Sequence, residues 1–188
     1  ETYTGALLDN VARDNFHRGV GKEAFVGKLA NTYNELNYAH PFREGNGRAT
    51  RVFLGSLAKD AGYHLDWSRV EPQRWIDVSA AGVQRNDLAG IRDVMRSVVT
   101  PERARAFANA VMSGEYGRAI EKHPELTGAV RLLSQVERTI REEYRGFDRE
   151  QGADVMLRAA LKIHQELHDG GVPRAQDAAK VHALVHGP

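Results

Sequence analysis

One short stretch of the chain gathers residue types that together could handle a phosphorylated ligand. His40 is its only side chain able to exchange a proton near neutral pH, and Glu44 offers the hard carboxylate oxygen that suits Mg²⁺. Gly45-Asn46-Gly47 would let the backbone approach a ligand closely and point N–H groups at it. Arg48 and Arg51 are three residues apart, so on a helix they share a face and can bind phosphate oxygens. These parts predict transfer chemistry at a nucleotide phosphate.

Helical spacing on both sides places this stretch in a loop between two helices. Apolar residues recur at helical spacing over 22–39 and again over 47–61. The glycines then fall where the second helix begins, and a helix N-terminus offers free N–H groups and a positive dipole end. Phe42 is apolar between polar neighbours, so within this nucleotide-binding segment we expect it to anchor the loop in the core. Each feature alone would favour an ordinary surface loop, but the whole set in one segment favours a site.

The rest of the chain also shows helical spacing, which predicts an all-α fold. No β-hairpin signature occurs, although 63–67 could be a brief extended piece. Thr100-Pro101 is the predicted boundary, because the residue before proline resists helix and Thr-Pro can cap and start a new one. We therefore expect a core domain over 1–100 and a helical extension of unknown role over 101–188. Further helices are predicted within 1–20 and over 73–82, 88–99, 103–112, 126–144, 151–168 and 174–185.

The composition is that of an ordinary globular protein. Apolar residues make up 41 % and charged residues 27 %, and the formal net charge is +1. This balance predicts no bulk attraction to nucleic acid or to membranes, and no apolar run approaches the roughly 18 residues of a membrane span. The chain has no cysteine, which excludes disulfides and thiolate metal sites. We expect a cytoplasmic protein, or one secreted into a host cell if it is an effector.

The central stretch is similar to the signature of Fic domains, His-x-Phe-x-(Asp/Glu)-Gly-Asn-Gly-Arg-x-x-Arg. The segment from Leu29 to Ala39 also looks like the helix that leads into this motif in such domains. The resemblance covers about residues 5–100 and implies a helical bundle with the active-site loop between its two central helices. Every fixed position of the signature is matched, by His40, Phe42, Glu44, Gly45, Asn46, Gly47, Arg48 and Arg51.

The resemblance implies transfer of AMP from ATP to a Tyr, Thr or Ser hydroxyl of a target protein, with release of pyrophosphate. In that case His40 deprotonates the hydroxyl, and Glu44 holds Mg²⁺ between the α- and β-phosphates. The backbone of Gly45-Asn46-Gly47 forms the anion hole, Arg48 binds the β-phosphate region and Arg51 the γ-phosphate. The family attribution thus specifies which phosphate is attacked, which the residue types alone leave open.

Three residues downstream of the motif are candidates for a contact with the nucleotide or for a place in the core. Asn86 is predicted as a nucleotide contact, because the turn that holds it helps to enclose the nucleotide in Fic domains. Trp67 and Trp75 are expected to be core anchors, and stacking on adenine is the alternative for them.

Regulation is predicted from a pattern that the chain lacks. Fic enzymes are commonly restrained by a glutamate in a Ser/Thr-x-x-x-Glu-Gly/Asn helix. Thr139 to Glu143 has the first half of this pattern, but Tyr144 follows where Gly or Asn is expected. We therefore expect the inhibitory glutamate on a preceding N-terminal segment or on a separate small antitoxin protein, and we favour the separate protein, which would make this protein a toxin or effector.

Two other functions remain open at this point. The β-hairpin flap that aligns the target in Fic domains is not found in the sequence, so the chain could be a non-catalytic nucleotide-binding or partner-binding module. It could also be a related phosphoryl or phosphocholine transferase. Phosphorylating relatives tend to carry Ala and Lys in place of the glycine and arginine, so Gly45 and Arg48 favour adenylylation.

Overall fold

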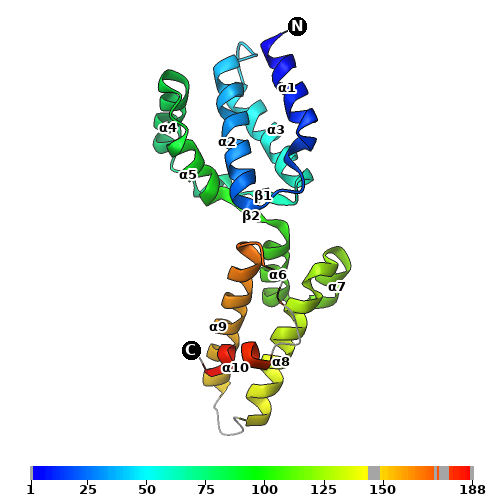
Figure 1. The fold of residues 1–188 in the computed structure, drawn as a ribbon. Helices are drawn as coiled ribbons and strands as arrows, with labels where there is room; N and C mark the ends of the chain where they lie inside the picture. The colour runs from blue at the N-terminus through cyan, green and yellow to red at the C-terminus, as the bar shows by residue number, and fades with distance from the viewer. Residues whose placement is uncertain (1, 144–148, 172, 174–177, 187–188) are drawn as a thin grey trace. The chain divides into compact units, whose positions relative to one another are not determined.

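Helices make up most of the computed structural model, which describes residues 2–143, 149–171, 173 and 178–186 and confirms the predicted all-α class (Figure 1). The chain divides into two units, Glu1–Glu102 and Arg103–Pro188. Each unit has its own buried apolar core. Among the described residues, no helix combines the length and apolarity needed to cross a bilayer.

The central helix of the first unit is α2 (Lys22–Ala39), which packs against α1, α3, α4 and α5. It begins after Gly21 and ends where His40 turns into the left-handed region, as the sequence predicts. Phe25 and Leu29 on its inner face are completely buried. The helices around it are α1 (Tyr3–Arg13), α3 (Asn46–Asp60), α4 (Pro72–Arg85) and α5 (Ala89–Val98), with 3₁₀ turns at Asn15–His17 and Trp67–Arg69 (Figure 1).

A left-handed turn after α1 is held against α2 by a buried histidine. All three residues of Asn15–His17 have positive φ angles, between 52° and 59°. The Nδ1 atom of His17 lies 2.6 Å from a carboxylate oxygen of Asp14, and its Nε2 atom lies 2.9 Å from the hydroxyl of Thr32 on α2. Lys28 donates to the same carboxylate at 2.7 Å. The hydrogen bonds from Lys28 and His17 lower the pKa of Asp14 below its ordinary value.

A small antiparallel sheet joins β1 (Tyr63–Leu65) to β2 (Val99–Pro101). The prediction that Thr100 caps and Pro101 begins a helix is therefore wrong, and α6 begins at Glu102. β-Branched residues favour extended backbone, and so does the position before proline. The two strands are far apart in sequence, so no hairpin turn marks their pairing.

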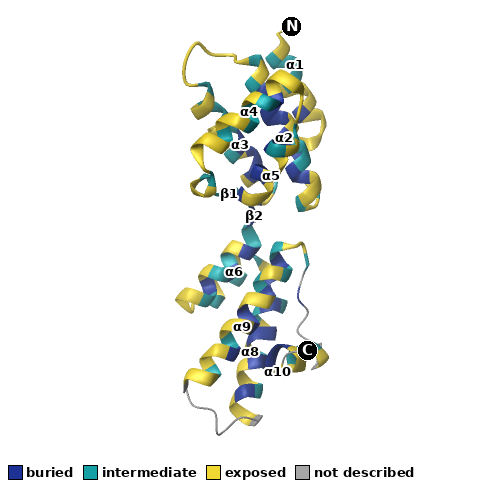
Figure 2. Ribbon diagram, turned by 90° about the vertical axis from the view of Figure 1, so that its left-hand side faces the viewer, coloured by how far each residue is buried: buried dark blue, intermediate teal, exposed yellow. Residues whose placement is uncertain are grey.

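The second unit is built from helices alone in its described part. α8, α9 and α10 pack against one another, and Figure 2 shows buried residues along the facing sides of α8 and α9. Helix α7 was not predicted, because turn signals lie on both sides of so short a segment. The start of the helix predicted at 174 and the side chain of Glu143 lie outside the described residues. The helices are α6 (Glu102–Ser113), α7 (Tyr116–Lys122), α8 (Thr127–Glu143), α9 (Arg149–His168) and α10 (Ala178–His186), with a 3₁₀ turn at Pro124–Leu126.

Candidate active site

His40 lies where α2 ends and the predicted active-site loop begins. Its backbone is left-handed, with φ of 42°, and its N–H donates to the carbonyl of Leu36 at 3.1 Å, which closes the helix. The side chain is exposed, and its Nδ1 atom lies 3.4 Å from the carbonyl of Asn37. A proton on Nδ1 would point to that carbonyl and leave Nε2 as the acceptor. In the described chain, no other hydrogen bond engages the His40 ring.

Phe42 does not anchor the loop, and this prediction is wrong. Its side chain is 54 % exposed, and residues 41–45 are exposed throughout. The loop is held instead by the carboxamide of Asn46, the first residue of α3. Its Oδ1 accepts from the Phe42 N–H at 2.9 Å, and its Nδ2 donates to the Phe42 carbonyl at 2.6 Å. A polar clamp on the backbone therefore fixes the loop where a buried aromatic ring was expected.

The N-terminus of α3, where the anion site is predicted, has backbone N–H groups without an intrahelical partner. Gly45 precedes the helix with φ of +79°, a conformation that favours glycine. Its carbonyl accepts from the N–H groups of Arg48 and Ala49, whereas the N–H groups of Asn46 and Gly47 precede the first intrahelical bond. A Cβ atom on Gly45 would stand 3.8 Å from Nη2 of Arg48, so this guanidinium lies beside the helix start.

The charged side chains of the motif are exposed and have no opposite charge beside them. No ion pair within the described ranges engages Glu44, Arg48 or Arg51. The described residues also contain no cluster of three or more His, Cys, Asp or Glu side chains placed to hold a metal. Glu44 can therefore supply one oxygen ligand, and the remaining ligands of a metal would have to come from water or a bound phosphate.

A pocket of about 420 Å³ opens between α2 and α4 and reaches His40. Its α2 side presents Asn37 and Tyr33, about one and two turns before the histidine, and its α4 side includes Trp75 and Ile76. Sequence reasoning missed Tyr33 and Asn37, although their spacing to His40 places all three on one helix face. The pocket therefore has His40 at one end and a mostly apolar wall on its α4 side.

The tryptophans and Asn86 differ in their relation to this pocket. Trp67 and Trp75 pack partly buried against the core, as predicted, and Trp75 also lines the pocket. Stacking on adenine thus stays open for Trp75. Asn86 ends α4 in the left-handed conformation, with φ of 52°, and Gln84 lines the pocket in its place. The contact between Asn86 and a nucleotide stays a prediction.

The phenol of Tyr33, which lines the pocket, has a shifted pKa. Burial raises that pKa above its ordinary value, and the hydrogen bond with Ser79 and the positive charge of Arg51 oppose the rise. Arg51 itself is not among the residues that line the pocket.

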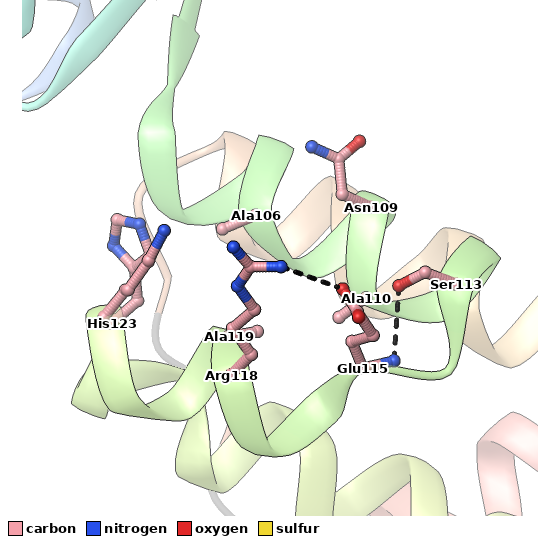
Figure 3. Close-up of a pocket in the computed structure, with 9 residues that line it drawn as sticks. Ala106, Asn109, Ala110, Ser113, Glu115, Arg118, Ala119 and His123 are labelled. Carbon is pink, nitrogen blue, oxygen red and sulfur yellow. Dashed lines mark hydrogen bonds and ion pairs between the residues drawn. The ribbon is translucent and has the colours of Figure 1, made fainter.

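A second, smaller pocket lies in the other unit between α6 and α7 (Figure 3). It has a volume of about 200 Å³, and Ala106, Ala110 and Ala119 are among the residues that line it. Arg118 pairs with Glu115 at 3.7 Å across its rim. None of the residues singled out in the sequence lines this pocket.

Comparison with protein families supports the resemblance of the first unit. Residues 4–58 match the Fic/DOC family. The chain is 45 % identical over 73 residues to protein adenylyltransferase VbhT of Bartonella schoenbuchensis, a match that covers 39 % of this chain and 15 % of that protein. It is 36 % identical over 95 residues to the probable protein adenylyltransferase Fic of Escherichia coli K12, covering 50 % of this chain and 47 % of that protein. The chain thus spans less than half the length of either relative.

A solved structure shares the fold of the same region. The BepC protein of Bartonella tribocorum, a VirB-translocated effector solved with bound AMPPNP, aligns with a TM-score of 0.51 and 27 % sequence identity. The alignment covers 53 % of this chain and 47 % of that protein.

Proposed function

We propose that this chain, whose first unit contains a Fic-family domain, transfers AMP from ATP to a Tyr, Thr or Ser hydroxyl of a target protein. One observation carries the proposal. His40 stands at the edge of the α2–α4 pocket, and the Asn46 clamp holds the start of α3 beside the loop that follows it. The proposed base would therefore lie beside a pocket that could take an apolar ring system, and the loop after it leads to a helix N-terminus that could bind an anion. Relatives named as protein adenylyltransferases and a similar structure with bound AMPPNP support this choice of reaction.

The triphosphate would lie against the N-terminus of α3. The N–H groups of Asn46 and Gly47 and the positive helix end suit an anionic phosphate. Arg48 lies beside that end, and Arg51 is one turn further along. Neither guanidinium is paired with a carboxylate in the described residues, so both can bind phosphate oxygens through two N–H groups each.

His40 would act as the general base. The oxygen of the target hydroxyl bonds to the α-phosphorus, and its proton passes to Nε2 of His40. The bond from the α-phosphorus to the α–β bridging oxygen breaks, and pyrophosphate leaves with that electron pair. The Asn37 carbonyl near Nδ1 favours the tautomer in which Nε2 can accept the proton.

Glu44 fits the role of a Mg²⁺ ligand. Its carboxylate is exposed and is not engaged by any described side chain. Mg²⁺ is commonly held by one or two carboxylates together with water and substrate phosphates, so a single protein ligand suffices. Bound there, Mg²⁺ would neutralise charge on the α- and β-phosphates.

The α2–α4 pocket would hold the adenosine. Its volume of about 420 Å³ lies in the range of small-molecule sites, and Trp75, Ile76 and Val83 give it apolar surface. Gln84 adds an amide that could bond to the edge of a base. In this proposal the nucleoside would lie on the α4 side of His40 and the phosphates on the α3 side.

The test is transfer of label from ATP to protein. The chain is incubated with α-labelled ATP, Mg²⁺ and a cell lysate, and His40→Ala is compared with His64→Ala. His64 is a part-exposed histidine of the same unit that lies 4.0 Å from Glu102, so it controls for loss of an imidazole. We expect labelled target bands that His40→Ala abolishes and His64→Ala retains. Unchanged labelling with His40→Ala would contradict the assigned base.

Parallel labels separate the other reactions. Retention of a γ-label instead of the α-label would indicate phosphoryl transfer, and choline label from CDP-choline would indicate phosphocholine transfer. Calorimetric binding of ATP without any transfer would indicate a nucleotide-binding module.

We also propose that a separate antitoxin protein inhibits this chain, as an antitoxin inhibits a toxin, by supplying the carboxylate that pairs with Arg51. No carboxylate in the described residues forms an ion pair with Arg51. A partner that placed a glutamate on Arg51 would compete with ATP phosphate for the same guanidinium. Co-purification with a small protein that suppresses labelling, and that binds Arg51→Ala more weakly than it binds the wild type, would test this regulation.

A further inference from the structure

A polar seam fastens α4 to α2 beside the pocket. The phenol of Tyr33 donates to the hydroxyl of Ser79 at 2.7 Å, and that hydroxyl donates to the carbonyl of Trp75 at 2.6 Å. The carboxamide of Asn37 reaches the Ser79 carbonyl at 3.4 Å. The ring of Tyr33 also packs on Trp75, with centroids 4.4 Å apart. Ser79 thus contacts both Tyr33 and Asn37 of α2, the first through its hydroxyl and the second through its backbone carbonyl.

Little else in α4 is buried. Its only buried residue is Gly82, whereas α5 buries Ile91, Val94, Met95 and Val98. Ile76 on α4 is 59 % exposed, and Trp75 and Val78 are only partly buried against the core, so no apolar side chain of α4 is fully buried. A helix with few buried apolar side chains takes its position from specific contacts and opens locally at lower free energy.

Gly82 shows that α4 approaches α2 as closely as the backbone permits. A Cβ atom there would stand 2.4 Å from Oδ1 of Asn34 and 2.6 Å from Cδ1 of Ile91. Both neighbours are buried, so neither side chain has open space to move into. Gly82 lies three residues after Ser79, so the close approach and the polar seam act on adjacent turns of one helix face.

We propose that Ser79 is a positioning residue that fixes α4 on α2 and thereby sets the shape of the pocket next to His40. The seam residues Tyr33, Asn37 and Ser79 themselves line the pocket, and its far wall, with Ile76 and Val83, belongs to α4. Movement of α4 therefore changes the width of the pocket. His40 ends α2 and the proposed anion site begins α3, so neither lies on the helix that the seam positions.

This inference has one consequence that is independent of function and one that rests on the proposed ATP reaction. Loss of the Ser79 hydroxyl leaves the partly buried Tyr33 phenol without its acceptor and loosens α4. The amides of 72–85 should then exchange faster with solvent whether or not the chain is an enzyme. If the pocket holds adenosine, KM for ATP should rise about fivefold to tenfold while kcat changes by less than about twofold.

The experiment compares Ser79→Ala and Tyr33→Phe with Ser56→Ala by hydrogen exchange and by ATP kinetics. Ser56 is a matched control, because its hydroxyl also donates to the carbonyl four residues earlier, at 3.2 Å, but it is exposed and no hydrogen bond among the described residues joins its side chain to another helix. We expect faster exchange over 72–85 in both seam variants and wild-type exchange in the control. Ser79→Thr keeps a hydroxyl and should restore slow exchange.

The outcomes separate the seam from the enzyme. Unchanged exchange over 72–85 in both seam variants, or equal acceleration by Ser56→Ala, overturns the positioning role. Faster exchange in the seam variants of a chain that neither binds ATP nor transfers AMP supports the seam and removes the proposed function. A fall in kcat with an unchanged KM would show that the seam acts on the reacting groups and not on the pocket, which also overturns the inference.

Discussion

The carboxamide of Asn46 bonds to both backbone groups of Phe42, accepting at 2.9 Å and donating at 2.6 Å. A side chain at the first position of α3 therefore closes the loop that leads from His40 to the helix. The relation gives Asn46 two functions. Its side chain shapes the loop, and its backbone N–H stays available at the helix end.

The first prediction concerns this clamp. Asn46→Ala removes both bonds, and Asn46→Asp keeps only the acceptor while adding a negative charge where phosphate would bind. We expect each to lower kcat/KM for AMP transfer by about 10-fold to 100-fold, and Asn46→Asp to lower it more. Kinetics with labelled ATP would measure this. Asn10→Ala, at an exposed asparagine whose side chain accepts from Arg13, should behave as wild type. An Asn46→Ala variant with full activity would remove the clamp from the mechanism.

The hydrogen bonds between Asn46 and Phe42 could not be predicted from the sequence. The residue types of the motif and the helices around it could be predicted, because helical spacing and glycine positions are local properties. Phe42 was assigned to the core because it is apolar. Hydrophobicity indicates that a residue can be buried, but not that a neighbour is present to bury it. The hydrogen bonds that hold the loop join two polar groups, and such pairing leaves no periodic signal.

The seam between α2 and α4 could not be predicted from the sequence either, and it joins residues that are far apart in the chain. Tyr33 and Ser79 are 46 residues apart, and both helices were predicted. What could not be predicted is which face of α4 meets α2, since Ile76 and Val83 would have been equally reasonable buried positions and are exposed. Gly82 determines sterically which face of α4 meets α2, because only a residue without a side chain fits so close to Asn34.

The second prediction concerns the guanidinium of Arg51. Arg51→Ala should weaken ATP binding by about 10-fold to 100-fold, because a cation that is unpaired in the described residues would no longer meet phosphate oxygens. Arg51→Lys should recover only part of the loss, since an ammonium keeps the charge but not the planar pair of donors. Lys59→Ala provides the control, because Lys59 is an exposed cation on the same helix, two turns away. Calorimetry with ATP would measure all three. Equal affinity for Arg51→Lys and wild type would show that charge alone matters.

The third prediction concerns pH. The folded-state pKa of Asp14 lies below its ordinary value of 3.8, because Lys28 and His17 bond to its carboxylate. A lowered folded pKa stabilises the fold above the unfolded pKa, and the contribution is lost as pH falls through the folded value. We expect Asp14→Asn to be less stable than wild type at pH 7, by less than about 1 kcal/mol because the carboxylate is partly exposed. The difference should shrink below about pH 4.

Urea unfolding at pH 7 and pH 3 would measure this difference, and a double-mutant cycle with Lys28→Met would assign it. The coupling energy between Asp14 and Lys28 should be present at pH 7 and absent once the carboxylate is protonated. A coupling of the same size at both pH values would mean that packing, and not charge, joins the two residues.

The fourth prediction compares the effect of alanine on stability at two helical glycines, Gly82 and Gly55. Gly82→Ala places a Cβ within 2.6 Å of buried atoms of Asn34 and Ile91, whereas Gly55 in α3 has no atom within 4 Å of its Cβ position. Alanine favours helix over glycine by about 0.5–1 kcal/mol, so Gly55→Ala should stabilise the fold by that amount. Gly82→Ala should destabilise it by about 1–3 kcal/mol, because the cost of overpacking exceeds the gain in helix propensity.

Urea unfolding of Gly82→Ala and Gly55→Ala measures the two changes in the free energy of unfolding, which should have opposite signs. Gly27→Ala, at a second open position in α2, should follow Gly55→Ala. The comparison is sharp because the same chemical change is made in three helices and only its surroundings differ. If Gly82→Ala stabilised the fold as the other two should, α4 would have room to move away from α2 at no cost. The close approach would then not determine where α4 lies, and the wall of the pocket beside His40 would be set by the polar contacts of Ser79 alone.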